Sequence, residues 1–311
     1  MINLIGNLNV DLILAQVEQR PEFGEEHLVD NMQLRPGALA NVIYPLAKLG
    51  EKPRVIATLG KDEFGDLIIK EMEPLMENRV IRTESATAVS VAVVNKEGSR
   101  YFVTYSGNFY DFTSDIIDRV DDLEQADATL FYGYFLLPSM GVEGAKKALR
   151  RAKAANQLTF FDANSAIDGW SEKSKNEINE LLPEMDFFMP NNEELFHLTG
   201  LSSIEDSIDF LKARGAKTII VKQGAEGATA YTDNVIVHHP GFPTTAFDTT
   251  GAGDAFNAGF MYAILKGYTM EKCLEFGNAL ASTVVARKEN RYPTLKEIED
   301  KIHSYQCEKI K

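Results

Sequence analysis

The feature that most constrains the fold of this chain is a regular alternation of short apolar runs with segments of helical period. The apolar runs are continuous, which is typical of strands buried on both faces of a parallel sheet. This order predicts an α/β fold in which helices cover both faces of a mostly parallel sheet. Strands are predicted at residues 2–6, 54–60, 128–135, 158–164, 186–191 and 218–224, a hairpin at 228–239, and helices at 65–77, 140–155, 172–182, 193–199, 204–214, 253–266, 271–287 and 294–305.

Two segments interrupt this alternation. Residues 12–35 and 83–110 contain runs in which every second residue is apolar, and Lys96, Glu97 and Gly98 mark a hairpin turn. We expect antiparallel strands that form a small β-sheet lid over a cleft. The alternative is that these strands extend one edge of the main sheet. The α/β core that binds nucleotide and substrate is then expected to comprise residues 1–11, 36–82 and 111–311, with no second independent domain.

Composition narrows the class of protein. The 44% of hydrophobic residues supports a sizeable core, and 32 basic against 46 acidic residues give a net charge of −14. This charge disfavours nucleic acid and anionic membranes as partners. Only Cys273 and Cys307 are present, no run reaches the roughly 18 apolar residues of a membrane helix, and the N-terminus lacks a basic leader. We therefore expect a cytoplasmic protein.

The most informative string is AFDTTGAGDAFNAGF at residues 246–260. Gly251, Ala252 and Gly253 precede a helical segment, so their backbone N–H groups can approach a phosphate at the positive end of a helix. Asp254 would repel a resting phosphate, but it can take the proton of a hydroxyl that attacks one. A tight turn with an aspartate N-cap explains the same string equally well. Neither a Walker A motif nor GxGxxG is present.

This string resembles the C-terminal signature of the ribokinase-like (PfkB) carbohydrate kinases. Further strings match that family in order and spacing. The resemblance implies a ribokinase-like three-layer α/β/α fold with a small β-sheet lid, ATP and Mg²⁺ as cofactors, and phosphoryl transfer to a hydroxyl group. It assigns Asp254 as general base and the 251–253 amides as stabilisers of developing charge. The other matching strings are GNLNVD (6–11), PGALAN (36–41), GKDEFG (60–65), FDAN (161–164), PNNEEL (190–195) and VKQGAEG (221–227).

The resemblance also implies where the substrate binds. Asp11 is the stronger of these assignments, because a carboxylate at the end of the first strand can accept two hydroxyl hydrogen bonds. The alternative is an Asx turn, which competes most strongly for Asn9. Pro36 replaces a usual glycine, and Pro45 is expected to kink the helix that follows. The residues assigned to the substrate are Asn9, Asp11, Gly37 and Asn41.

For the nucleotide and the metals, the resemblance implies a second set of residues. Glu194 is expected to hold Mg²⁺, largely through water. Asp248 and Thr250 match positions beside a monovalent cation such as K⁺, although Glu289 stands where a glycine is usual and leaves potassium activation open. Residues assigned to ATP are Asn191, Lys222, Gly224, Gly227 and Asn278.

The substrate class follows from two departures. Ala166 and Ser106 occupy places where many relatives carry an arginine that meets acidic groups, so we expect a neutral sugar, ribose- or fructose-like. The alternatives are an adenosine-like nucleoside kinase on the same fold and a noncatalytic ligand-binding relative. A homodimer through the lid strands is a further hypothesis.

Overall fold

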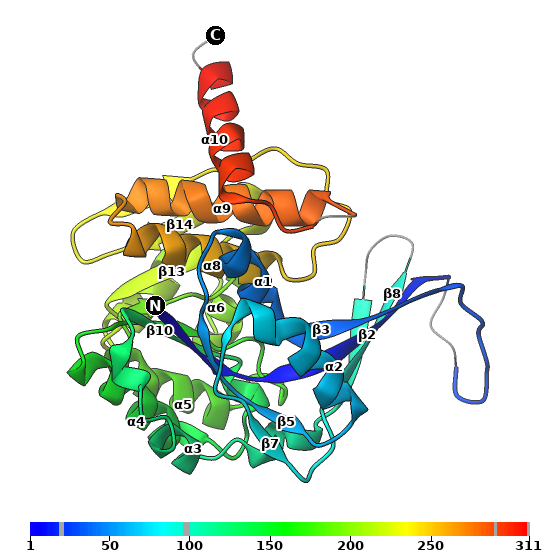
Figure 1. Cartoon of the computed structure of the whole chain (residues 1–311). Helices are drawn as coiled ribbons and strands as arrows, with labels where there is room; N and C mark the ends of the chain where they lie inside the picture. The colour runs from blue at the N-terminus through cyan, green and yellow to red at the C-terminus, as the bar shows by residue number, and fades with distance from the viewer. Residues whose placement is uncertain (19–21, 96–99, 289–290, 310–311) are drawn as a thin grey trace.

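A computed structural model describes residues 1–18, 22–95, 100–288 and 291–309 of the chain. Its centre is a nine-stranded sheet of order β15-β14-β13-β12-β11-β10-β1-β4-β6, which is parallel except for the pairs β13–β14 and β14–β15 (Figure 1). The predicted mostly parallel sheet is confirmed. Its strands are β1 (Ile2–Gly6), β4 (Arg54–Ile56), β6 (Glu77–Asn78), β10 (Ala128–Tyr132), β11 (Leu158–Asp162), β12 (Phe187–Phe188), β13 (Thr218–Lys222), β14 (Ala228–Tyr231) and β15 (Ile236–His239).

Helices cover both faces of this sheet, as the continuous apolar strands predict. Neighbouring strand residues contribute to different hydrophobic clusters: Leu4 and Phe160 pack on one face, and Ile5 and Phe161 on the other. The first face carries α1 (Ala40–Lys48), α2 (Glu63–Met72), α8 (Ala252–Leu265), α9 (Met270–Ala286) and α10 (Leu295–Lys309); the second carries α3 (Asp115–Asp118), α4 (Gly141–Ala154), α5 (Glu172–Leu181), α6 (Asn192–Thr199) and α7 (Ile204–Lys212).

A small separate sheet projects from this body (Figure 1). Its order is β3-β2-β8-β9, from β2 (Leu8–Val17), β3 (Asn31–Ala38), β8 (Val89–Asn95) and β9 (Arg100–Tyr105). Two of its pairs are antiparallel as expected, but β2 and β8 run parallel. The sheet also includes residues 8–11, which the sequence analysis placed with the core, while the expected turn at 96–98 lies outside the described residues.

Several strands end earlier than the apolar runs suggest. The run 128–135 stops being a strand at Tyr132, because Gly133 takes a left-handed φ of 69° and a short 3₁₀ turn, Tyr134–Leu136, follows. The run 54–60 divides into β4 and β5 (Thr58–Gly60), and β5 pairs with β7 (Ile81–Thr83) outside the main sheet. An apolar run in the sequence indicates buried residues, and residues stay buried beyond the point where the hydrogen bonds of the strand end.

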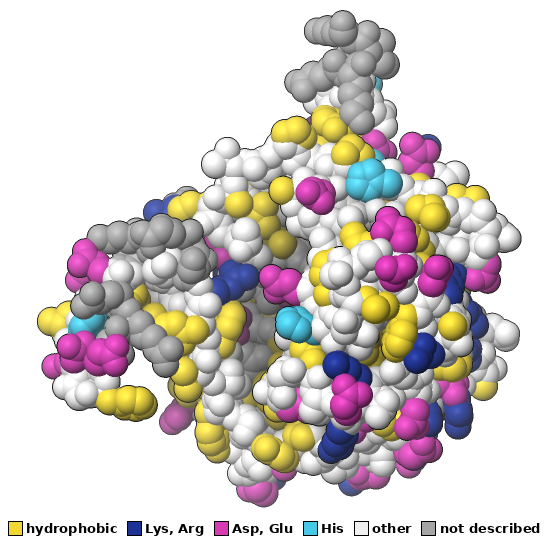
Figure 2. All heavy atoms as spheres, turned by 180° about the vertical axis from the view of Figure 1, so that it is seen from behind, with side chains coloured by type: hydrophobic (Ala, Val, Ile, Leu, Met, Phe, Trp, Pro, Cys, Tyr) yellow, Lys and Arg dark blue, Asp and Glu magenta, His cyan; other side chains and the backbone are white. Residues whose placement is uncertain are grey.

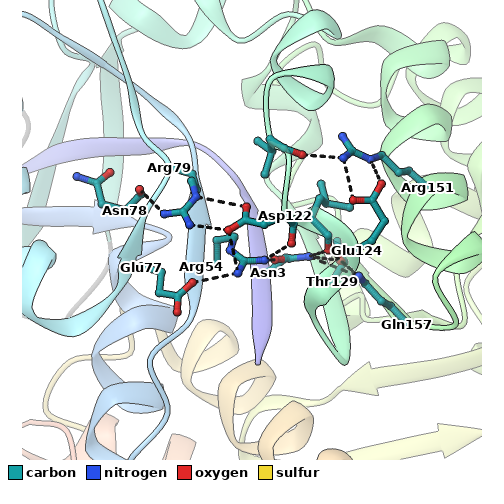
Figure 3. A network of polar contacts seen from close by, with 12 residues as sticks. Asn3, Arg54, Glu77, Asn78, Arg79, Asp122, Glu124, Thr129, Arg151 and Gln157 are labelled. Carbon is teal, nitrogen blue, oxygen red and sulfur yellow. Dashed lines mark hydrogen bonds and ion pairs between the residues drawn. The ribbon is translucent and has the colours of Figure 1, made fainter.

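A buried polar network closes the amino ends of the central strands (Figure 3). Arg54 is 4% exposed, and its Nη2 atom lies 3.1 Å from both Glu77 Oε2 and Asp122 Oδ2. Beside it, Asn3 donates to the Leu123 carbonyl at 2.8 Å. Loss of either partner would leave this buried cation less compensated, which is costly. The opposite, carboxyl ends of the strands are thus left for a ligand.

None of the helices in the described ranges is long and apolar enough to cross a membrane.

Candidate active site

The carboxyl ends of the parallel strands open into a cavity of about 650 Å³ between the body and the small sheet. Figure 2 shows the surface hollowed there. Most residues that the sequence analysis singled out line this cavity, while Gly37 and Asp248 lie beside it. The lining includes Asn9, Asp11, Asn41, Asn191, Glu194, Lys222, Gly224, Gly227, Thr250, Gly251, Ala252, Gly253, Asp254 and Asn278.

The start of α8 forms one wall of the cavity. Gly251 is its N-cap with a left-handed φ of 74°, and a Cβ there would lie 3.2 Å from Cγ of Asn41. The expected cradle of three amides is only partly present, because the Ala252 amide already donates to the Thr249 carbonyl at 3.2 Å. Within the described chain, the amides of Gly253 and Asp254 donate to no backbone carbonyl. These first-turn donors are therefore available to an anion.

Asp254 lies in the first turn of α8, partly buried at the floor of the cavity. Burial raises its pKa to about 7, and the negative charge of Asp162 contributes to the rise. Lys222 and hydrogen bonds with Tyr132 and Asn41 oppose it. A carboxylate whose pKa lies near neutrality is well matched to accept a proton from a hydroxyl group.

Asp162 is the centre of the site's hydrogen bonds, a role that the sequence analysis missed. It ends β11 and is 2% exposed. Its Oδ2 atom accepts 2.6 Å hydrogen bonds from Lys222 Nζ and from Asn257 Nδ2. Burial lowers the pKa of Lys222, but the negative charges of Asp162 and Glu194 outweigh this effect, so that the pKa is raised. The signal was the FDAN string, which places a carboxylate at the end of a buried strand.

Asn191 and Glu194 form a capping box at the start of α6. Asn191 Oδ1 accepts from the Glu194 amide and Glu194 Oε2 from the Asn191 amide, both at 2.9 Å. Glu194 is buried, with 8% of its surface exposed, and it lines the cavity. Burial, and to a smaller extent the charge of Asp162, raises the pKa of Glu194 to about 7. Glu194 is therefore a buried acid close to the charges of Asp162 and Asp254, and not a solvated residue of the first helical turn.

Three of the four predicted substrate residues, Asn9, Asp11 and Gly37, lie where β2 and β3 pair, and Asn41 lies in α1. Asn9 Nδ2 donates to Asp11 Oδ1 at 2.8 Å, and burial raises the pKa of Asp11 against the effects of Asn9 and Arg35. Gly37 makes room for this carboxylate, because a Cβ on Gly37 would lie 2.2 Å from Asp11 Oδ1. Asn41 is buried and accepts from the Tyr292 hydroxyl at 3.2 Å.

The other predicted nucleotide residues, Gly224, Gly227 and Asn278, also line the cavity. Gly227 has a φ of 86°, and a Cβ there would lie 2.0 Å from the His239 carbonyl oxygen. Asn278, buried in α9, lies 3.4 Å from His239 Nδ1 through its side-chain amide. The close approach of these segments requires glycine at 227, whereas a Cβ on Gly224 would meet no atom of the described residues within 4 Å.

The small sheet contributes an arginine that the sequence analysis did not identify. Arg100 of β9 lines the cavity and donates to Thr250 Oγ1 at 2.6 Å. Phe102 and Thr104 lie two and four residues further along β9, on the same face of the strand, and also line the cavity. Ala166 and Ser106, where arginines were expected to be missing, are not among the lining residues.

A second arginine, Arg291, donates hydrogen bonds to the oxygen atoms that were expected to bind a monovalent cation. Arg291 Nη1 lies 2.7 Å from Asp248 Oδ2, and its Nη2 atom donates to the Asp248 carbonyl at 3.2 Å and to the Thr250 carbonyl. These oxygens are therefore already neutralised by a guanidinium group. Glu289, the other departure in this loop, lies outside the described residues.

A helix N-terminus, an acid of near-neutral pKa and a buried lysine at the carboxyl edge of a doubly covered parallel sheet define a small-molecule phosphotransferase. The particular family follows from comparison: residues 1–297 match the model of the pfkB family carbohydrate kinases, and the chain belongs to this family. It is a phosphotransferase that acts on a sugar hydroxyl.

Relatives and solved structures agree with this assignment. The chain is 30% identical over 263 residues to a 5-dehydro-2-deoxygluconokinase of Clostridium perfringens, which covers 80% of this chain and 78% of that protein. A Thermotoga maritima ribokinase superposes with a TM-score of 0.81 at 27% identity, over 97% of this chain and 99% of that chain. An E. coli candidate ribokinase II, solved with ATP and Mg²⁺, gives a TM-score of 0.83 at 25% identity with the same coverages.

Proposed function

We propose that the chain transfers the γ-phosphoryl group of ATP to a hydroxyl or hydroxymethyl group of its sugar, with Asp254 as general base. The carboxylate takes the hydroxyl proton while the hydroxyl oxygen bonds to the γ-phosphorus, and the bond from that phosphorus to the β–γ bridging oxygen breaks to release ADP. The observation that carries this proposal is the position of Asp254, which lines the cavity in the first turn of α8 beside the backbone amides of residues 253 and 254, unpaired among the described residues. Burial, which raises the pKa of Asp254 to about 7, is consistent with this role.

The cation Mg²⁺ fits the residues present. Glu194 offers a buried carboxylate at the cavity wall, and Mg²⁺ needs few protein ligands because it keeps waters and phosphate oxygens. Bound Mg²⁺ would neutralise phosphate charge. Lys222 would add a second positive charge there, held in place by Asp162, and Gly224, Gly227, Asn191 and Asn278 would line the nucleotide.

A neutral ribose- or fructose-like sugar is the first candidate substrate. Asn9 and Asp11 present an amide and a carboxylate to its hydroxyl groups, with Asn41 beside them. This candidate keeps the expectation drawn from Ala166 and Ser106, although neither residue lines the cavity. An adenosine-like nucleoside is the alternative within the same fold.

An acidic sugar is the second candidate, and Arg100 favours it. Arg100 lines the cavity together with Phe102 of the same strand, and its Nη1 atom lies 2.6 Å from Thr250 Oγ1. Arginine is the usual bidentate partner of a carboxylate. The C. perfringens relative is named for a gluconate-type substrate, which agrees with this candidate.

The small sheet would act as a lid and as a dimer interface. Its cavity face carries Asp11, Ser90, Arg100 and Thr104, whereas the strand register places Leu34, Val91 and Val103 on the other face. An exposed apolar face of this kind commonly marks an association surface. It supports a homodimer through the lid.

The test is ADP release with Mg²⁺-ATP and a panel of ribose, fructose, aldonic and keto-deoxy sugar acids, and adenosine. We expect turnover with a sugar, and the comparison of neutral with acidic sugars decides between the two candidates. Turnover with adenosine alone would favour the nucleoside kinase. No ADP release with any compound, in protein shown to bind ATP, would favour the noncatalytic relative and overturn the proposal.

A further inference from the structure

Three oxygen atoms of the segment that leads into α8 converge on one guanidinium group. They are the carboxylate Oδ2 and the carbonyl oxygen of Asp248 and the carbonyl oxygen of Thr250, and all accept from Arg291. Asp248 Oδ1 also accepts from the Thr250 amide at 2.8 Å, which closes a tight turn. Gly251, the N-cap of α8, follows directly.

Convergent carbonyl oxygens repel one another unless a cation lies between them. A metal ion such as K⁺ is one solution, and a buried guanidinium with five donors in a fixed plane is another. The Arg291 side chain is only 11% exposed, and its planar guanidinium group carries a positive charge to these oxygens. Its two Nη atoms already span the oxygens that a metal ion would need.

The surrounding charge also disfavours a second cation. Arg35 Nη2 and Arg100 Nη1 lie 3.9 Å and 3.8 Å from the Asp248 carboxylate. One acidic group thus faces three arginines, and a monovalent ion placed there would meet net positive charge. Burial opposes the ionisation of Asp248, but hydrogen bonds from Thr250 and the charges of Arg291 and Arg35 hold its pKa below the usual range.

We propose that the Arg291 guanidinium is a built-in substitute for a monovalent cation: it is a positioning residue that fixes the 248–251 turn and so aims the first amides of α8. The inference rests on the proposed function. Tyr292 acts at the same place, since its hydroxyl group donates to Asn41, the residue against which Gly251 packs. The kinase therefore works without K⁺.

The first experiment compares wild-type protein in K⁺, Na⁺ and tetramethylammonium chloride at equal ionic strength. We expect the same kcat and the same melting temperature in all three salts. Activation or stabilisation by K⁺ over tetramethylammonium would overturn the inference. The melting temperature needs no turnover, so this outcome can be told apart from a failure of the proposed function, which would show as no ADP release in any salt.

The second experiment uses Arg291→Ala. A displaced turn misaims the amides, so we expect kcat in tetramethylammonium to fall about 10²-fold, with a smaller change in KM for the sugar. K⁺ or free guanidinium should restore part of kcat and raise the melting temperature of this variant only. Full activity of Arg291→Ala in tetramethylammonium would overturn the inference.

Two further variants serve as controls. Arg287→Ala removes a nearby arginine whose Nη2 atom pairs with Glu297 at 2.6 Å, and it should leave kcat and the salt response unchanged. Arg291→Lys keeps a charge at the same place and guards against loss of folding in the alanine variant. We expect Arg291→Lys to retain more activity than Arg291→Ala in tetramethylammonium. If K⁺ activates the two variants to the same extent, the charge of Arg291 does not have the proposed role.

Discussion

Lys222 and Asp162 form an ion pair with Nζ and Oδ2 2.6 Å apart, although the strands that they end, β13 and β11, are separated in the sheet by β12. Asp162 shares the same oxygen with Asn257 of α8. One buried carboxylate therefore connects two strand ends with the helix that carries Asp254. Its charge acts on the lysine and on the proposed base together.

Replacement of Asp162 by asparagine should move the pH profile. The charge of Asp162 helps to raise the pKa of Asp254 to about 7, and Lys222 lowers it. Without that charge the pKa of Asp254 falls, so the acid limb of kcat/KM shifts to lower pH. The measurement is kcat/KM from pH 5 to 9 in Asp162→Asn. Asp186→Asn, which changes a carboxylate bonded to Thr159 at the other end of β11, is the control and should leave the limb in place.

Asp254→Asn should lose most turnover while it still binds ATP. A general base contributes about 10²–10⁴ in rate, and asparagine cannot accept the hydroxyl proton. In the wild type, kcat/KM should fall as the pH drops through about 7, because the protonated acid is inactive. ATP affinity by calorimetry and ADP release by coupled assay test both parts. Wild-type kcat in this variant would remove Asp254 from the mechanism.

The same substitution should stabilise the fold at high pH. The pKa of Asp254 rises from 3.8 to about 7 on folding, so the folded state binds the proton more tightly. Wild-type stability is therefore lost as pH rises through this window, whereas Asp254→Asn has no such ionisation. Melting temperatures should be similar at pH 4, and the variant should melt higher at pH 8. An equal difference at both pH values would contradict this.

Much of the architecture could be predicted from the sequence, because it depends on local patterns of apolar and polar residues. Continuous apolar strands such as 158–162 and the helices between them predict a doubly covered parallel sheet, and its carboxyl edge then predicts the location of the site. Strand ends were less predictable. Gly133 ends β10 through a left-handed backbone, while the apolar run continues to Phe135.

The parts of the site that sequence analysis missed depend on contacts between distant segments. Arg100 reaches Thr250 across 150 positions, and Arg291 reaches Asp248 across 43. Nothing in the local sequence of either arginine indicates these partners. The pairing of β8 with β2 brings β9 over the cavity, and that pairing is set by tertiary packing.

Arg100→Ala should separate acidic from neutral substrates. If the sugar carries a carboxylate, loss of a charge-assisted hydrogen bond lowers kcat/KM about 10- to 100-fold for acidic sugars and leaves neutral sugars nearly unchanged. Steady-state kinetics with both classes gives the comparison. Arg119→Ala is the matched control, because Arg119 caps the C-terminus of α3, is 63% exposed and pairs with Asp115 on the surface. An equal effect on both sugar classes would assign Arg100 to lid closure.

The outer face of the small sheet should hold two copies together. Met32, Val103 and Tyr105 are 66%, 62% and 58% exposed there, so a second copy would remove much apolar surface from water. Light scattering should give twice the chain mass of 34.6 kDa for the wild type. Val103→Asp places a charge in this contact and should give a monomer, because an unpaired buried charge is costly. Val235→Asp, at a valine 54% exposed in the β14–β15 turn, should remain a dimer. A monomeric wild type at micromolar concentration would exclude this interface and leave the sheet a role in closing the cavity alone.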